Sequence, residues 1–106
     1  MDIGTLKDYS DLAHDLAQTK KNALEKMRSR QIVAYNGRLF QANAETINVV
    51  QTFKAHSKDF YMLDTNDNPC HITDPDDFLR ILIERNQETL NTYHQLHEDL
   101  KNKRLK

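Results

Sequence analysis

Residues 32–40 read IVAYNGRLF, residues 43–47 read NAETI and residues 59–69 read DFYMLDTNDNP, and these three runs decide the fold. The first run is rich in β-branched, aromatic and bulky residues on both sides of Asn36-Gly37. Asparagine and glycine tolerate the positive φ angles that a two-residue hairpin turn requires. The run therefore predicts a β-hairpin with its turn at these two residues.

A short helix and a second hairpin are expected to follow. Asn43 is a suitable N-cap for a helix from residue 44 to about residue 56, which has one apolar face. Residues 59–63 predict a third strand, and residues 69–72 predict a short fourth strand after a polar turn. Because Pro69 has no backbone N–H to donate, the fourth strand is expected at a sheet edge.

Two long helical patterns flank this stretch. Before it, Thr5 is a suitable N-cap, and apolar residues recur at three- and four-residue spacing up to an expected end at residues 28–31. After it, a Thr73 cap and Pro75 in the first turn are typical of a helix start. The predicted fold class is α+β: long N-terminal helix, β-hairpin, short helix, second β-hairpin and long C-terminal helix, with a small antiparallel sheet packed on the helices.

A single domain, residues 1–106, is expected from the chain length and a hydrophobic content of 38%. Residues 1–30 and 86–106 are expected to be helical extensions of that domain. Past its first two turns the last helix keeps only a narrow apolar seam, as in a coiled coil, and it can pair within the chain or between copies. The candidate interaction face consists of Tyr9, Leu16, Met27, Leu90, Tyr93, Leu96 and Leu100.

The charge balance limits the classes of partner. Fifteen basic and sixteen acidic residues give a formal net charge of −1, so nucleic acid is not an expected partner. Basic residues cluster at Lys26, Arg28 and Arg30, where they are expected to complement the dipole at a helix C-terminus. Protein partners are therefore expected instead.

Membrane association and secretion are not expected either. No run approaches the roughly 18 apolar residues of a membrane helix, and residues 1–5 lack the basic and apolar parts of a signal peptide. The single cysteine, Cys70, cannot form an internal disulfide, which suits a reducing compartment.

The polar turn at residues 64–68 is one candidate for a cation site. Its oxygen-bearing side chains stand at alternate positions, as at the start of a calcium loop. The pattern then fails, because Pro69 stands where an EF-hand needs glycine and Pro75 where it needs a bidentate glutamate. The run therefore predicts a structural turn.

Other chemistry is poorly supported as well. His94 and His97 share one helix face, but no third metal ligand is predicted near them. Cys70 and His71 are neighbours on a predicted strand, so their side chains point to opposite faces. We therefore expect no catalytic residue, no metal and no cofactor, and the chain is not expected to be an enzyme.

Residues 35–47, YNGRLFQANAETI, and residues 63–78, LDTNDNPCHITDPDDF, carry a family resemblance. They resemble an uncharacterised domain family of bacteriophage tail and tail-fibre-associated proteins, and the resemblance covers about residues 24–100. The chain departs in having Phe60-Tyr61 where the family has a tryptophan. The shared positions are turns, caps and core positions, so the resemblance implies a fold and supplies no catalytic or ligand residue.

The resemblance and the narrow helical seams favour a non-catalytic phage structural or assembly protein. It is expected to associate with the tail, baseplate or tail fibre through protein–protein contacts, as a homo-oligomer. The alternative is a small phage-encoded inhibitor that binds and blocks a host defence protein. The expected location is the host cytoplasm after synthesis and, for a structural component, the tail of the virion.

Overall fold

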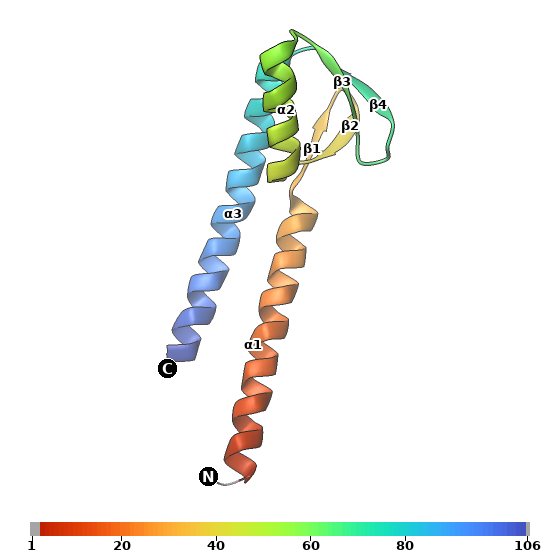
Figure 1. Cartoon of the computed structure of the whole chain (residues 1–106). Helices are drawn as coiled ribbons and strands as arrows, with labels where there is room; N and C mark the ends of the chain where they lie inside the picture. Colours follow the sequence, from red (N-terminus) through yellow and green to blue (C-terminus); the bar gives the residue numbers. More distant parts are fainter. Residues whose placement is uncertain (1–2, 106) are drawn as a thin grey trace.

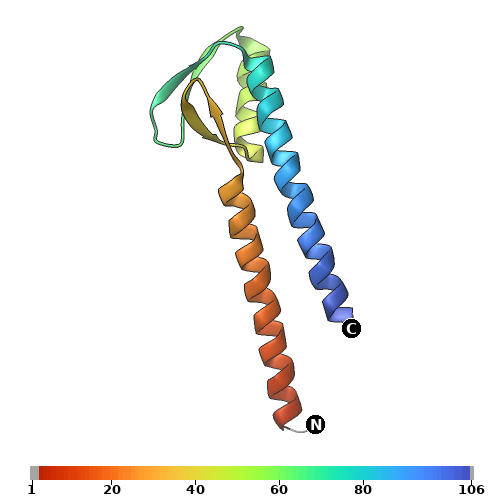
Figure 2. The same ribbon diagram turned by 180° about the vertical axis from the view of Figure 1, so that it is seen from behind.

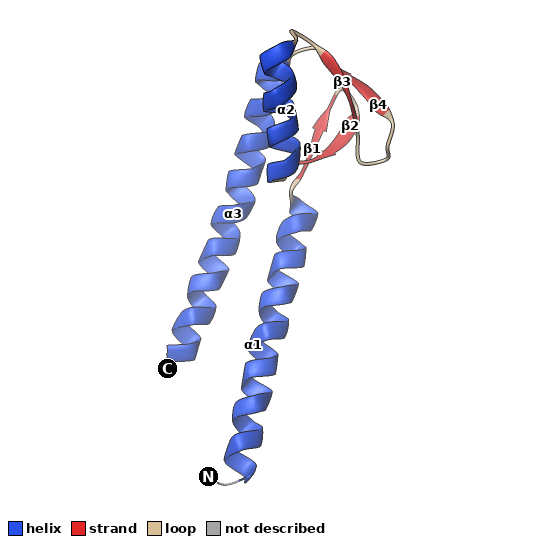
Figure 3. Cartoon of the chain, in the orientation of Figure 1, coloured by secondary structure: helices blue, strands red, loops and turns tan. Residues whose placement is uncertain are grey.

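The computed structural model describes the backbone of residues 3–105 and the side chains of residues 11–102. The α+β class and the predicted order of elements are confirmed (Figure 3). The strands pair as two antiparallel sheets of two strands each, one for each hairpin. The elements are α1 (Ile3–Arg30), β1 (Ile32–Tyr35), β2 (Arg38–Gln41), α2 (Ala44–His56), β3 (Phe60–Leu63), β4 (Pro69–Ile72) and α3 (Pro75–Leu105).

The molecule is elongated, with extents of 66 × 24 × 22 Å and a radius of gyration of 19.5 Å. A compact chain of this length would have a radius of about 13 Å. Both hairpins, α2 and the start of α3 form a head, residues 31–84, from which α1 and α3 project (Figures 1 and 2). The two helices contact each other and run antiparallel. We call residues 11–30 of α1 and 85–102 of α3 the arms.

The first hairpin has the predicted turn. Asn36 has a φ of 51° and Gly37 a φ of 74°, the two positive angles of a type I′ turn. In the resulting register Val33 pairs with Phe40, and both side chains are buried. The backbone N–H of Thr65 donates to the carbonyl of Leu39 at 2.9 Å, which joins the second hairpin to the first.

The core of the head forms around the first turns of α3. Phe78 and Leu82 are fully buried and, four residues apart, lie on one face of the helix. The Phe78 ring centroid lies 4.7 Å from that of Tyr35 and 4.9 Å from that of Phe40. Among the described side chains, the buried apolar ones all lie in the head: Val33, Phe40, Ala42, Val50, Cys70, Ile72, Phe78 and Leu82.

The start of α2 agrees with the prediction, whereas the start of α1 does not. The Asn43 side chain accepts a hydrogen bond from the backbone N–H of Thr46 at 2.9 Å, so the predicted N-cap is confirmed. The prediction that Thr5 caps the first helix is wrong, because α1 begins at Ile3 and Thr5 lies within it. Gly4 lowers helix propensity without ending the helix.

The predicted Thr73 cap of the last helix is also wrong. Asp74 caps α3, since its Oδ1 accepts a hydrogen bond from the backbone N–H of Asp77 at 3.2 Å. The backbone N–H of Asp74 donates to the Tyr35 hydroxyl at 3.1 Å. The first hairpin therefore holds Asp74 at the cap position, a long-range contact that local sequence does not reveal.

Candidate protein-interaction site

The turn between β3 and β4 is built around one buried carboxylate. Asp64 Oδ1 accepts backbone hydrogen bonds from Asn66 at 2.8 Å and from Asn68 at 2.9 Å, and Oδ2 lies 3.3 Å from Arg38 Nη1. The hydrogen bond from Asn68 is the main cause that lowers the pKa of Asp64; the Asn66 and Arg38 contacts add to it, and burial opposes it. One oxygen thus holds the turn, and the other ties it to Arg38 of β2.

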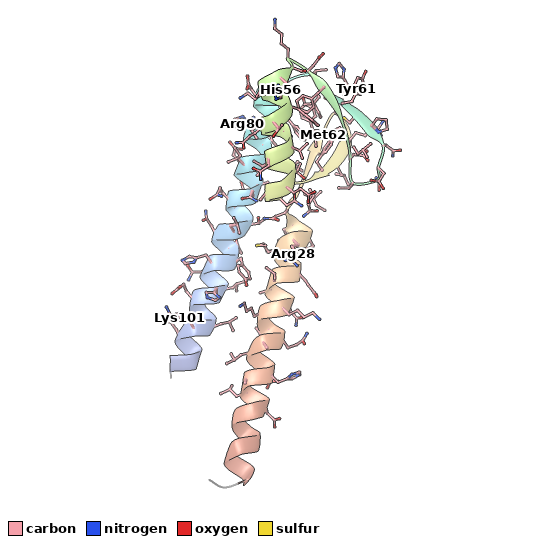
Figure 4. The ribbon with its side chains drawn as sticks, viewed as in Figure 1. Arg28, His56, Tyr61, Met62, Arg80 and Lys101 are labelled. Atoms are coloured by element: carbon pink, nitrogen blue, oxygen red, sulfur yellow. The ribbon has the colours of Figure 1, made fainter. Side chains whose placement is uncertain are left out.

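Cys70 and His71 lie on opposite faces of β4. The cysteine is 5% exposed and belongs to the core. The His71 ring stacks on Tyr61 with centroids 4.7 Å apart, and its Nε2 lies 3.0 Å from a carboxylate oxygen of Asp59. Figure 4 shows Tyr61 at the outside of this hairpin, where its side chain is exposed. Within the part of the chain that the structure describes, no group of three or more His, Cys, Asp or Glu side chains could hold a metal ion.

Two grooves lie between the arms. The head-end groove has a volume of about 490 Å³, with Ala23, Met27, Tyr93 and Leu96 as its apolar lining. The free-end groove lies toward the far ends of the helices, where Figure 4 shows Lys101. Its apolar lining consists of Leu12, Ala13, Leu16, Ala17 and Leu100. Among the helices that the structure describes, none has the length and the apolar character that a membrane span requires.

The grooves contain most of the residues of the predicted interaction face. Those in the head-end groove are Met27, Tyr93 and Leu96. Those in the free-end groove are Leu16 and Leu100. Leu90 is 40% exposed and lines neither groove. The Tyr9 side chain lies outside the described residues.

Apolar side chains of the arms remain in contact with solvent. Leu12 is 56% exposed and Leu96 is 40% exposed, although both line a groove. The predicted face does not include Leu12. Because Leu12 lies four residues before Leu16, the two share one face of the helix, and this spacing could have identified Leu12. The two helices alone therefore do not cover the seam between them.

Charged side chains lie at the rim of the head-end groove. Lys26 and Arg30 extend from α1, and on the α3 side Arg85 Nε lies 4.0 Å from Glu88 Oε2. From the sequence, the positive charges at the end of α1 are expected to complement the helix dipole. Their place in the groove depends on α3, which is distant in the chain.

An apolar groove between two helices can receive the apolar face of a third, amphipathic helix, and charges at its rim select the partner. The head-end groove has this form, with a rim to which α1 contributes only positive charge. No protein-family model, curated protein or solved structure matches this chain.

Proposed function

We propose that this chain is a non-catalytic assembly protein that acts through protein contacts of its arms. The observation that carries this proposal is the incomplete burial of the arm seam, where Leu12 is 56% exposed and Leu96 is 40% exposed. Exposed apolar side chains that gather in one place mark interaction surfaces. A homo-oligomer, or a complex with another protein, would cover them.

The head serves as a base that sets the direction of the arms. The Gln41 side chain donates a hydrogen bond to the carbonyl of Arg28, which lies in the last turn of α1, at 2.9 Å. On the other arm, the Asn86 side chain donates to the carbonyl of Ala42 at 3.0 Å. Hydrogen bonds therefore tie both arms to the segment at β2, so their spacing at the head end is set before a partner binds.

The resemblance of residues 35–47 and 63–78 to phage tail-associated proteins supports a more specific assignment. On this ground the chain is a phage structural or assembly protein of the tail, baseplate or tail fibre. It is made in the host cytoplasm and, as a structural component, becomes part of the virion.

Mass spectrometry of particles purified from the phage or prophage that encodes the chain tests this assignment. The chain is expected in the particles, whereas its absence from particles and assembly intermediates would contradict the assignment and favour an inhibitor of a host protein. Introducing aspartate at both Leu16 and Leu96 should exclude the chain from particles, because each change adds a charge to one groove. The control is Leu63→Asp, at an exposed leucine on the head, which should leave incorporation unchanged.

A further inference from the structure

One stripe of polar side chains along α1 has the same spacing when read from either end. Its members follow one another at intervals of 4, 4, 3, 4 and 4 residues, which keeps them on one face of the helix. The stripe consists of Asp11, Asp15, Thr19, Asn22, Lys26 and Arg30. It is acidic at the free end, uncharged in the middle and basic at the head end.

The four charges of the stripe are available to a partner. The ion pairs among the described side chains all involve other residues. Lys26 and Arg30 lie at the rim of the head-end groove, and Asp11 and Asp15 are exposed beside the half-exposed Leu12. An acidic segment with an exposed leucine is thus the kind of ligand that the head-end groove fits.

We propose that this ligand is the free end of α1 of a second copy, and that two copies pair their α1 helices antiparallel. A two-fold axis between Thr19 and Asn22 would set Asp11 opposite Arg30 of the other copy, and Asp15 opposite its Lys26. The inference rests on the proposed function, in which the arms contact a protein, and it identifies that protein and its orientation.

The apolar residues next to the stripe also have a spacing that is the same from either end, about a midpoint one residue before that of the stripe. Leu12, Leu16, Ala23 and Met27 are separated by 4, 7 and 4 residues. An antiparallel pair therefore brings the leucines of one copy onto the Ala23 and Met27 of the other, in the head-end groove. This contact covers the side chain of Leu12 in both copies.

Antiparallel pairing is the orientation that the charges favour. Residues 11–30 overlap over about 29 Å in this arrangement, with opposite charges at both ends. A parallel pair would instead set acidic against acidic and basic against basic, which is unfavourable. Lys20 lines the free-end groove and so lies off the stripe, away from the two-fold axis.

Sedimentation equilibrium of the full chain tests the proposal. The wild-type chain is expected to form a dimer that weakens between about 50 mM and about 500 mM salt. The double variants Asp11→Lys/Asp15→Lys and Lys26→Glu/Arg30→Glu should each weaken it by at least about tenfold, because four attractions become four repulsions. The quadruple variant, and an equal mixture of the two double variants, should dimerise again.

Lys58→Glu, an exposed charge reversal on the head, is the control and should leave the dimer unchanged. Circular dichroism checks that each variant keeps its helices. A wild-type chain that stays monomeric at high concentration overturns the pairing, and so do double variants that dimerise like the wild type, as a parallel pair would. A monomer that is still found in phage particles overturns this inference alone and leaves the proposed function standing.

Discussion

Two leucines of α3, Leu82 and Leu96, lie fourteen residues apart and differ in how far their side chains are exposed to solvent. Leu82, in the head, is fully buried, whereas Leu96, in the arm, is 40% exposed. Around Leu82 the start of α3 meets α2 and β1, whereas at Leu96 α3 lines a groove with α1. Burial in this protein therefore follows the number of elements that converge on a side chain, and two antiparallel helices are too few to bury a leucine.

Alanine at these two leucines should produce the largest contrast. Leu82→Ala is expected to lower the free energy of unfolding by about 2–5 kcal/mol, because it leaves a cavity in the core. Leu96→Ala should cost about 1 kcal/mol or less. Urea denaturation followed by circular dichroism, at one low protein concentration, measures both. Equal losses would show that the arm is packed as tightly as the head.

Alanine should lower the free energy of unfolding at one of the two glycines of the chain and not at the other. Gly37 has a φ of 74° and open space around it, so Gly37→Ala strains the backbone only and should cost about 1–2 kcal/mol. Gly4 lies within α1, where alanine favours the helix, so Gly4→Ala should not destabilise. Thermal unfolding of both variants checks this pair. A stable Gly37→Ala chain would be inconsistent with the type I′ turn.

The N-cap of α2 gives a smaller effect. Asn43→Ala removes the hydrogen bond to the backbone N–H of Thr46 and should cost about 1 kcal/mol. Asn48→Ala, at an exposed position inside the same helix, is the control and should change stability by less than about 0.5 kcal/mol. If both variants had the same stability, the cap would not contribute to the head.

Acid should weaken the head through Asp64. Because its pKa is lowered in the folded chain, its contribution is complete above the unfolded value of about 3.9 and is lost as the pH falls through the folded value. Asp64→Asn should therefore be less stable at neutral pH and lose less stability on acidification. Urea midpoints measured across this acidic range test the prediction, and parallel curves for variant and wild type would contradict it.

Most of the elements could be predicted because their signals are local. The Asn36-Gly37 turn, the Asn43 cap and the bounds of α2 depend on backbone preferences of neighbouring residues. The Thr73 prediction failed where a distant residue intervened, since Tyr35 holds Asp74 at the cap position. Local preference was thus a good guide except where a tertiary contact competed with it.

The candidate site was only partly predictable. Helical spacing placed Leu16, Met27 and Tyr93 on one seam, and each lines a groove. Leu90 fits the same sequence pattern but lines neither groove, because the seam follows the path of α1 along α3. Spacing on one helix does not specify that path.

The sequence by itself determined the elements, their order and the α+β class, since turns, caps and apolar periodicity act over a few residues. Only the tertiary structure decided which apolar residues are buried, because burial requires several elements, distant in the chain, to meet at one point. It also brought Lys26 and Arg30 to the rim of a groove whose other wall belongs to α3. The charge pattern of α1 was already present in the sequence, but its relation to a binding surface required both arms.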